Sequence, residues 1–191
     1  MIFNKHSTLK GSHALLSASK YHWINYDDEK LDRYFASQVA AVRGTELHAL
    51  AHDLIRLKVK LPQSAKTLNM YVNDVLGYRM IPEQLLFYSE NCFGTPDAIS
   101  YSEKTKILRI SDLKTGVGPT SEKQLLVYAA LFFLEYGKAL GVTAFDVETQ
   151  LRIYQNDEVR LYLADPVDIT YIIDKIISFD RRLKVLREES Q

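Results

Sequence analysis

The first 80 residues carry apolar positions at helical spacing. Between residues 35 and 58 these positions recur along one helical face, which predicts a long amphipathic helix that ends before Pro62. The apolar residues of this pattern are Val39, Leu47, Leu50, Leu54 and Leu57. A shorter helix is expected over residues 65–76, closed by Gly77, and a further helix start is indicated at Ser17 within residues 12–26.

Between residues 84 and 164 the pattern becomes typical of β-strands. Residues 84–91, 94–102 and 106–114 are predicted to be strands, and the polar residues 103–105 suit a hairpin turn between the last two. Residues 147–155 and 158–164 are expected to form a second strand pair, joined by a turn at Asn156 and Asp157.

Two more helices complete the prediction. The centre of residues 121–137 is apolar on nearly every side, which indicates a buried helix. A last helix is expected to begin at Pro166, a residue favoured in the first turn, with Asp165 as its cap. This order of elements favours an α/β or mixed α+β fold, in which helices flank a central mixed sheet.

The chain length of 191 residues suits one domain with a core of its own. We expect a helical part at about residues 12–80, a core at about 84–165 and a C-terminal helix at about 166–190. No apolar stretch approaches the ~20 residues of a membrane-spanning helix, and the N-terminus lacks the apolar centre of a secretion signal. A cytoplasmic protein without membrane contact is therefore expected.

Cysteine content and charge narrow the function classes. The single cysteine, Cys92, excludes an intramolecular disulfide and a four-cysteine iron–sulfur or zinc site within one chain. The 24 basic and 24 acidic residues balance, which argues mildly against nucleic-acid binding because affinity for DNA comes mainly from phosphate neutralisation. A local basic groove, or the combined surfaces of several chains, would still provide that neutralisation.

The predicted strand at residues 106–114 carries the first candidate chemistry. Side chains alternate between the faces of a strand, so Asp112 and Lys114 share one face with Leu108 and Ile110. A carboxylate and an ammonium group therefore lie side by side at the end of this strand. Such Asp-x-Lys tripeptides are common, and by itself this one is more often a surface ion pair than a catalytic group.

A second carboxylate, Asp97, is expected next to the first. A hairpin that turns around residues 104 and 105 pairs Asp97 with Asp112, and directly opposed residues have Cβ atoms ~5 Å apart. Like charges at that separation repel each other, which suggests a cation between them. Oxygen ligands favour a hard ion such as Mg²⁺ or Mn²⁺ over zinc. A divalent ion beside a lysine is suited to phosphodiester hydrolysis, because both offset charge on the phosphate.

These motifs resemble a known nuclease family. The segments GTPD at Asp97, DLK at Asp112 and QLLVY at Gln124 are similar to the RecB-like branch of the PD-(D/E)xK nucleases. That branch includes phage exonucleases, nuclease domains of bacterial recombination complexes and CRISPR-associated exonucleases. The resemblance spans about residues 43–128, and the HALLSAS segment at residues 13–19 is also similar to phage members. It implies a restriction-endonuclease-like core.

The resemblance also implies roles for individual residues. Asp97, Asp112 and Lys114 would be catalytic, and Mg²⁺ or Mn²⁺ would be the cofactor, as one ion or two. The implied metal ligands are His48, Asp97, Asp112 and the backbone carbonyl of Leu113. Gln124 and Tyr128 would position DNA or support the site. Gly44, one helical turn before His48, would leave room for close approach on that face.

Several alternatives stay open beside these roles. Glu46 is a candidate extra ligand or base, although a solvated helix residue is the commoner case. His48 and His52 are spaced for a zinc site, but Ala49 stands where that motif needs Glu. Tyr128 would also serve as an ordinary core residue. Some relatives hold an iron–sulfur cluster near the N-terminus, whereas this chain reads WINYDD there, so a cluster-free member is expected.

The expected function is therefore a metal-dependent deoxyribonuclease. The resemblance implies an exonuclease that acts on DNA ends in recombination, repair or phage DNA metabolism. A homo-oligomer and a recombination partner protein are compatible with it. The alternative is a catalytically inactive module with the nuclease fold, which binds nucleic acid or assembles with partners.

Overall fold

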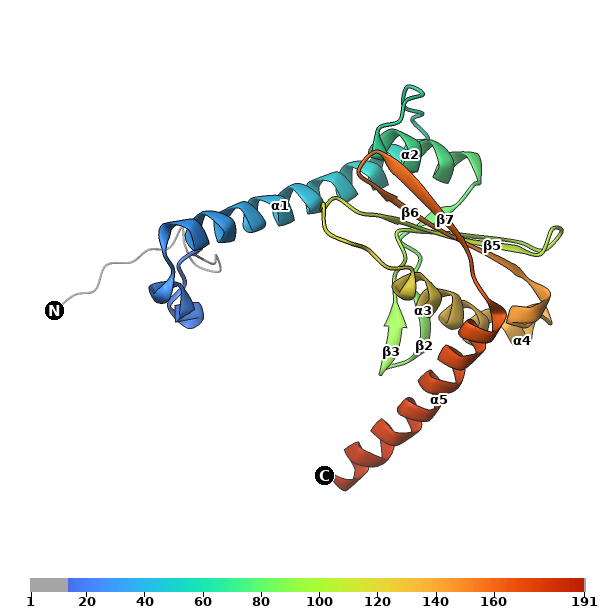
Figure 1. The fold of residues 1–191 in the computed structure, drawn as a ribbon. Coiled ribbons are helices and arrows are strands. Elements are labelled where there is room, and N and C mark those ends of the chain that lie inside the picture. The colour runs from blue at the N-terminus through green and yellow to red at the C-terminus, as the bar shows by residue number, and fades with distance from the viewer. Residues whose placement is uncertain (1–13, 191) are drawn as a thin grey trace. The chain divides into compact units, whose positions relative to one another are not determined.

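The computed structural model describes residues 14–190 (Figure 1). The chain divides into two compact units, which meet between Arg43 and Gly44. The first unit contains the 3-10 helix η2 (Ala18–Asn25) and the start of the long helix α1 (Asp28–Arg56). The second contains the rest of α1 and all elements that follow it.

Helix η2 begins directly after Ser17, as predicted, but it is a 3-10 helix. Ser12 and His13, at the start of the predicted N-terminal segments, lie outside the described residues. Helix α1 begins seven residues earlier than expected because Asp27 starts it: the Asp27 carboxylate accepts a hydrogen bond from the Lys30 backbone N–H at 2.7 Å. Residues 28–34 lack a clear apolar period, so the pattern alone missed this turn.

A five-stranded mixed sheet forms the centre of the second unit, as predicted. Its strand order is β1-β4-β5-β6-β7, with β5 and β6 parallel and every other neighbouring pair antiparallel. The strands are β1 (Ile81–Pro82), β4 (Ala98–Ser102), β5 (Ile107–Leu113), β6 (Glu148–Gln155) and β7 (Glu158–Leu163). The turn between β6 and β7 places Asn156 and Asp157 at φ of 52° and 60°, a conformation typical of a tight hairpin.

Helices cover both faces of this sheet (Figure 1). On one face, α3 (Lys123–Phe132) packs against β5, β6 and the final helix α5 (Pro166–Glu189). Asp165 caps α5 as expected, since it accepts a 2.8 Å hydrogen bond from the Val167 N–H. On the other face, α2 (Thr67–Gly77) contacts β5, β6 and β7. Strand β5 therefore serves two cores, with Leu108 and Ile110 in the first and Leu113 in the second.

The predicted helix at residues 121–137 is buried as expected, but it is not one regular helix. After α3 the backbone widens to a π-turn, η3 (Phe133–Gly137), and continues as the short α4 (Lys138–Leu140). Gly141 ends it at φ 65°, where glycine adopts the left-handed conformation without strain. The 3-10 turn η4 (Ala144–Asp146) then leads into β6.

The strands predicted at residues 84–91 and 94–102 are only partly correct. Residues 86–94 form a separate hairpin, β2 (Leu86–Ser89) and β3 (Cys92–Gly94), outside the main sheet. The chain then passes through the buried Pro96, which has no N–H for a strand ladder, and β4 starts only at Ala98. The short strand β1, which pairs with β4, was not predicted.

The buried face of α1 also differs from the prediction. Leu50 and Leu57 remain 48% and 66% exposed, whereas the buried residues of this helix are Gly44, Ala51 and Ile55. The helix uses mainly small residues for close packing, which an apolar pattern based on leucine does not reveal. No helix in the described part of the chain is both long and apolar enough to cross a membrane.

Helix α2 ends at Gly77, as predicted. The left-handed conformation beyond it falls on Arg79, at φ 53°. Lys58, just beyond α1, has a similar φ of 56°. Both positions therefore hold a long basic side chain where glycine would avoid strain.

Asp180 of α5 connects the β2–β3 hairpin to this helix by hydrogen bonds. Its side chain is 3% exposed and accepts hydrogen bonds from the Ser89 hydroxyl at 2.6 Å and the Asn91 amide at 2.9 Å. Lys184 lies 2.7 Å from its other oxygen. The hydrogen bond from Lys184, followed by those from Ser89 and Asn91, lowers the pKa of Asp180 to about 2.

This lowered pKa predicts a pH-dependent contribution to stability. An unfolded Asp titrates near ~3.9, so the contribution is complete above that pH and is lost as pH falls towards 2. We expect Asp180→Asn to destabilise the fold most at pH 6–7 and progressively less below pH 4, measured by urea unfolding from pH 7 to 3. Asp174→Asn, an exposed position on the same helix, is the control. A destabilisation independent of pH would contradict the assignment.

Candidate active site

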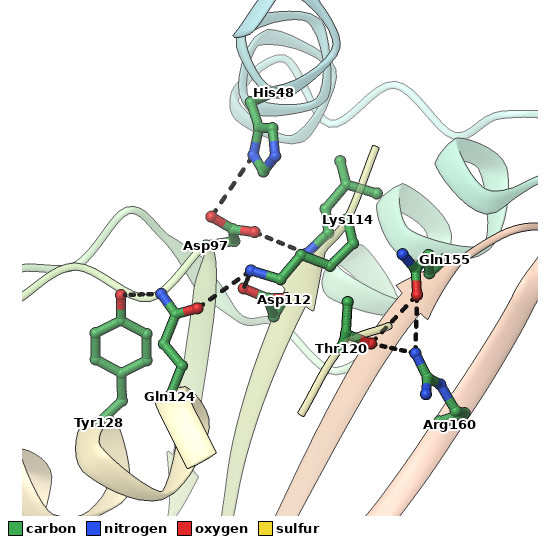
Figure 2. A network of polar contacts seen from close by, with 10 residues as sticks. His48, Asp97, Asp112, Lys114, Thr120, Gln124, Tyr128, Gln155 and Arg160 are labelled. Atoms are coloured by element: carbon green, nitrogen blue, oxygen red, sulfur yellow. Dashed lines mark hydrogen bonds and ion pairs between the residues drawn. The ribbon is translucent and has the colours of Figure 1, made fainter. Parts of the chain in front are cut away.

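The β4–β5 hairpin brings Asp97 and Asp112 together in the predicted register. Ala98 pairs with Ser111, so Asp97, directly before β4, lies opposite Asp112 (Figure 2). The Asp97 carboxylate then takes the place of a ladder carbonyl, because its Oδ2 accepts a 2.7 Å hydrogen bond from the Leu113 N–H. This bond fixes Asp97 at the end of β5.

Asp112 is the most buried carboxylate of this group. Its side chain is 6% exposed, and Oδ1 accepts a 3.0 Å hydrogen bond from the Lys114 ammonium group. Its Oδ2 is also buried, yet no protein group in the described residues donates to it. A buried acceptor without a partner costs about 1–3 kcal/mol, so this oxygen is a strong candidate to bind a ligand.

Lys114 connects the acidic pair to α3. Its Nζ donates to the Gln124 side-chain carbonyl at 3.1 Å, and the Gln124 amide donates to the Tyr128 hydroxyl at 2.9 Å (Figure 2). Gln124 and Tyr128 are one helical turn apart and so share a face of α3. Gly94 makes room for this face, since a Cβ there would lie 2.8 Å from the Tyr128 ring.

His48 approaches the same group from α1. Its Nδ1 lies 3.6 Å from Asp97 Oδ1 (Figure 2), whereas the Leu113 N–H donates to the other oxygen, Oδ2. Glu46, the candidate extra ligand, is exposed and forms no hydrogen bond or ion pair with Asp97, Asp112 or Lys114. The structure therefore brings His48 to the site and leaves Glu46 outside it.

Burial and neighbouring charge set the proton affinity of Asp97. Burial raises the pKa of this carboxyl, the Leu113 N–H lowers it, and the negative charge of Asp112 raises it again. His48 and Lys114 oppose these effects to a smaller degree. The net pKa lies above its usual range, as expected where two acidic groups share a site without a cation between them.

The donor groups fit a divalent cation, although they do not form a closed cluster. Among the described residues, no three His, Cys, Asp or Glu side chains converge closely enough to hold an ion. One oxygen of each aspartate is already used by a protein donor: Asp97 Oδ2 accepts from the Leu113 N–H, and Asp112 Oδ1 accepts from the Lys114 ammonium group. The unpartnered Asp112 Oδ2 is a carboxylate oxygen, the type of ligand that a hard cation prefers. In a strand the carbonyl and the N–H of one residue leave on the same edge, so the Leu113 carbonyl belongs to the edge that faces β4.

The zinc reading of His48 and His52 finds no support in the contacts of His52. Its two ring nitrogens lie 3.9 Å from Asp53 and 3.7 Å from Glu83, and neither contact involves Asp97. A small hollow lies beside His48, His52 and Asp97, with Tyr71 in its wall. Burial raises the pKa of the Tyr71 phenol, and the charge of Asp97 adds to that effect.

Sequence reasoning missed the residue that anchors the loop between Lys114 and Gln124. Gln155, at the end of β6 and 5% exposed, donates its amide to the carbonyls of Gly116 at 2.5 Å and Gly118 at 2.8 Å. Arg160 in turn donates to the Gln155 carbonyl at 2.9 Å and contacts Thr120 (Figure 2). The only sequence signal was a polar residue at the end of an otherwise buried strand.

Comparisons with family models, with curated proteins and with solved structures find no match to this chain. The nuclease resemblance therefore depends on the motif residues and on their arrangement. Hydrogen bonds join Asp112, Lys114, Gln124 and Tyr128 in succession. His48 contacts Asp97, which lies opposite Asp112 in the hairpin.

Gly44 of α1 packs closely against Thr115, the residue after Lys114, and this contact gives a testable prediction. A Cβ at this position would lie 2.7 Å from Thr115 Oγ1, directly after Lys114. Overpacking costs about 1–3 kcal/mol, and the higher helix propensity of alanine returns about 1 kcal/mol, so we expect Gly44→Ala to destabilise the protein by about 1 kcal/mol net. Adding Thr115→Ala should restore most of this, because the next atom, Thr115 Cβ, is 3.7 Å away.

The measurement is urea unfolding of both variants, with Gly77→Ala as the matched control. No atom lies within 4 Å of a Cβ at Gly77, and alanine is the better helix former there. Gly77→Ala is therefore expected to be neutral or stabilising. A Gly44→Ala variant as stable as the wild type would contradict the prediction, because the Thr115 side chain would then move aside without cost.

Proposed function

We propose that this chain is a Mg²⁺- or Mn²⁺-dependent deoxyribonuclease that hydrolyses phosphodiester bonds. The observation that carries the proposal is Asp112: a buried carboxylate with one oxygen unpartnered and an ammonium group on the other. A second carboxylate, Asp97, lies directly before the neighbouring strand β4. A fold without catalytic use for this arrangement would be more stable with fewer buried acids.

In the proposed site, His48, Asp97, Asp112 and the Leu113 carbonyl hold the cation. When bound, the ion lowers the pKa of a coordinated water and neutralises charge on the scissile phosphate. The bond from the Leu113 N–H keeps Asp97 in place, so that this acid does not need to reorganise during the reaction.

Lys114 has the second role in the proposal. Its side chain is about one-third exposed, and its ammonium group donates to Asp112 and Gln124. From that position it orients the attacking water and offsets the negative charge that develops on the phosphate. The Gln124–Tyr128 pair fixes the lysine and lies where a DNA backbone would approach.

The finer parts of the proposal rest on the family resemblance. These are the action on DNA ends as an exonuclease, a part in recombination, repair or phage DNA metabolism, and the absence of an iron–sulfur cluster. The proposals of a homo-oligomer, of a recombination partner protein and of a cytoplasmic location are equally finer parts. The contacts within the site support only the more general proposal, hydrolysis of a phosphodiester.

One observation favours the alternative, a nuclease-fold module without catalysis. The ligand side chains of the described residues meet in pairs and not as a group of three. Balanced net charge points in the same direction. The two candidates differ in whether a cation binds at Asp112, so metal binding and cleavage are tested separately.

The first test is cleavage. We expect the wild type to degrade linear DNA in Mg²⁺ or Mn²⁺ and to spare circular DNA, with Asp112→Asn and Lys114→Ala each lowering the rate by about a hundredfold or more. Glu103→Gln and Lys104→Ala, on the exposed β4–β5 turn, make the same chemical changes away from the site. Cleavage that survives in both site variants, with circular dichroism unchanged, would refute the assignment.

The second test is metal binding without substrate. Mn²⁺ at a hundred times its dissociation constant stabilises a protein by about 2.7 kcal/mol, and we expect a matching rise in the wild-type melting temperature. Asp112→Asn should abolish this rise. Lys114→Ala should keep it or enlarge it, because the competing ammonium group leaves Asp112 Oδ1 free. An equal rise in the wild type and Asp112→Asn would place the ion elsewhere and favour the non-catalytic module.

A further inference from the structure

A groove of 660 Å³ lies next to the candidate active site, between the end of α1, the end of α2 and β1. Its floor is apolar. The floor residues are Ile55, Val75, Leu76, Met80, Ile81 and Pro82. His52 and Pro82 also line the small hollow that contains His48 and Asp97. The groove and the hollow that Asp97 lines are therefore neighbours with two residues in common.

The rim of the groove is basic. Arg56, Lys58, Lys60 and Arg79 line it, and no aspartate or glutamate lies among the described residues that do so. Arg56 has an exposed ion-pair contact with Asp53 at 3.6 Å. For Lys58, Lys60 and Arg79 the described residues provide no side-chain hydrogen bond or ion pair. The groove is thus a local positive region on a chain of zero net charge.

Two of these cations stand on strained backbone. Lys58 and Arg79 have φ of 56° and 53°, and a left-handed residue with a side chain costs about 1–2 kcal/mol. The nearby helix C-termini attract cations and offset part of this. Glycine adopts this conformation without strain. The basic side chains at Lys58 and Arg79 are therefore present at an energetic cost. Strained residues of this kind cluster at binding sites.

We propose that this groove binds one unpaired nucleotide of a DNA single strand whose phosphates continue into the candidate active site. An apolar floor below a cationic rim matches a nucleotide, which combines a flat apolar base with an anionic phosphate. In a duplex the bases are stacked inside, so only the rim would be used. The inference builds on the proposed nuclease function, and it adds the strand's path and its single-stranded state.

The rim is tested by binding in EDTA, where no cleavage can interfere. The probe is a fluorescent oligothymidylate in an anisotropy titration from 0.05 to 0.3 M salt. Each phosphate contact contributes about 0.7 to the slope of log K against log salt for single strands. Replacing Lys58, Lys60 and Arg79 together by Ala should therefore lower the slope by about 2, and the affinity at 0.1 M salt by about a hundredfold.

The matched control removes the same charge elsewhere. Lys104, Lys138 and Arg181 are exposed and lie outside the groove, so their joint replacement by Ala should leave slope and affinity close to the wild type. Equal losses in the two triple variants would overturn the proposal, since the groove would then act only through overall charge. A wild type that does not bind the oligonucleotide at 0.05 M salt would also overturn it.

The floor is tested by Ile81→Ser. Ile81 is 56% exposed at the groove, so its replacement should leave the fold intact. We expect about fivefold weaker binding of oligothymidylate at an unchanged salt slope, and no effect on an abasic oligonucleotide or a duplex, because neither presents an unpaired base. Equal effects on the thymidylate and abasic strands would overturn the base-binding role.

Failure of this inference is distinguishable from failure of the proposed function. Groove variants that bind and degrade DNA like the wild type would overturn the groove and leave the nuclease standing. A wild type that binds the strand through the groove but never cleaves it in Mn²⁺ would refute the nuclease and leave the groove as a single-strand binding site.

Discussion

The register of the β4–β5 hairpin decides where the other groups of the candidate site can lie. A shift of one residue would move Asp112 to the opposite face of the sheet and separate it from Asp97. Two features hold the register: the alternating core residues of β5, and the bond from the Leu113 N–H to the Asp97 carboxylate. Asp97, the candidate catalytic acid, is in this way part of the strand pairing itself, so the geometry of the candidate site depends on the stability of the sheet.

The charges at this site are balanced by groups from different parts of the second unit. Lys114 follows β5, His48 comes from α1, and Gln124 comes from α3. A buried acid that keeps its charge needs such neighbours, because transfer from water without them is strongly unfavourable. The compensation is still incomplete, as the raised pKa of Asp97 and the unpartnered Asp112 oxygen indicate. A divalent cation would complete it, which is the physical content of the proposed function.

The sequence allowed prediction of features that depend on local pattern, and it failed where distant segments decide. The Asp97–Asp112 register followed from a polar turn between two alternating strands, and the α5 cap from Asp165 before Pro166. The β2–β3 hairpin was missed because its position depends on packing against α3 and η3 and on hydrogen bonds to Asp180 of α5, all distant in sequence. The Gln155 anchor joins residues almost 40 positions apart, a distance over which no periodicity operates.

Balanced charge is a weak guide to nucleic-acid binding here, because the charges are separated in space. The 24 basic and 24 acidic residues cancel over the whole chain, yet the groove rim has several cations and no acidic neighbour among its described lining residues. Salt screens charges beyond ~10 Å, so a phosphate in the groove responds mainly to this rim and little to acids on distant helices. Asp97 lines the small hollow that shares His52 and Pro82 with the groove. A strand bound along the rim would meet repulsion from the Asp97 carboxylate there, and the proposed cation would offset that repulsion.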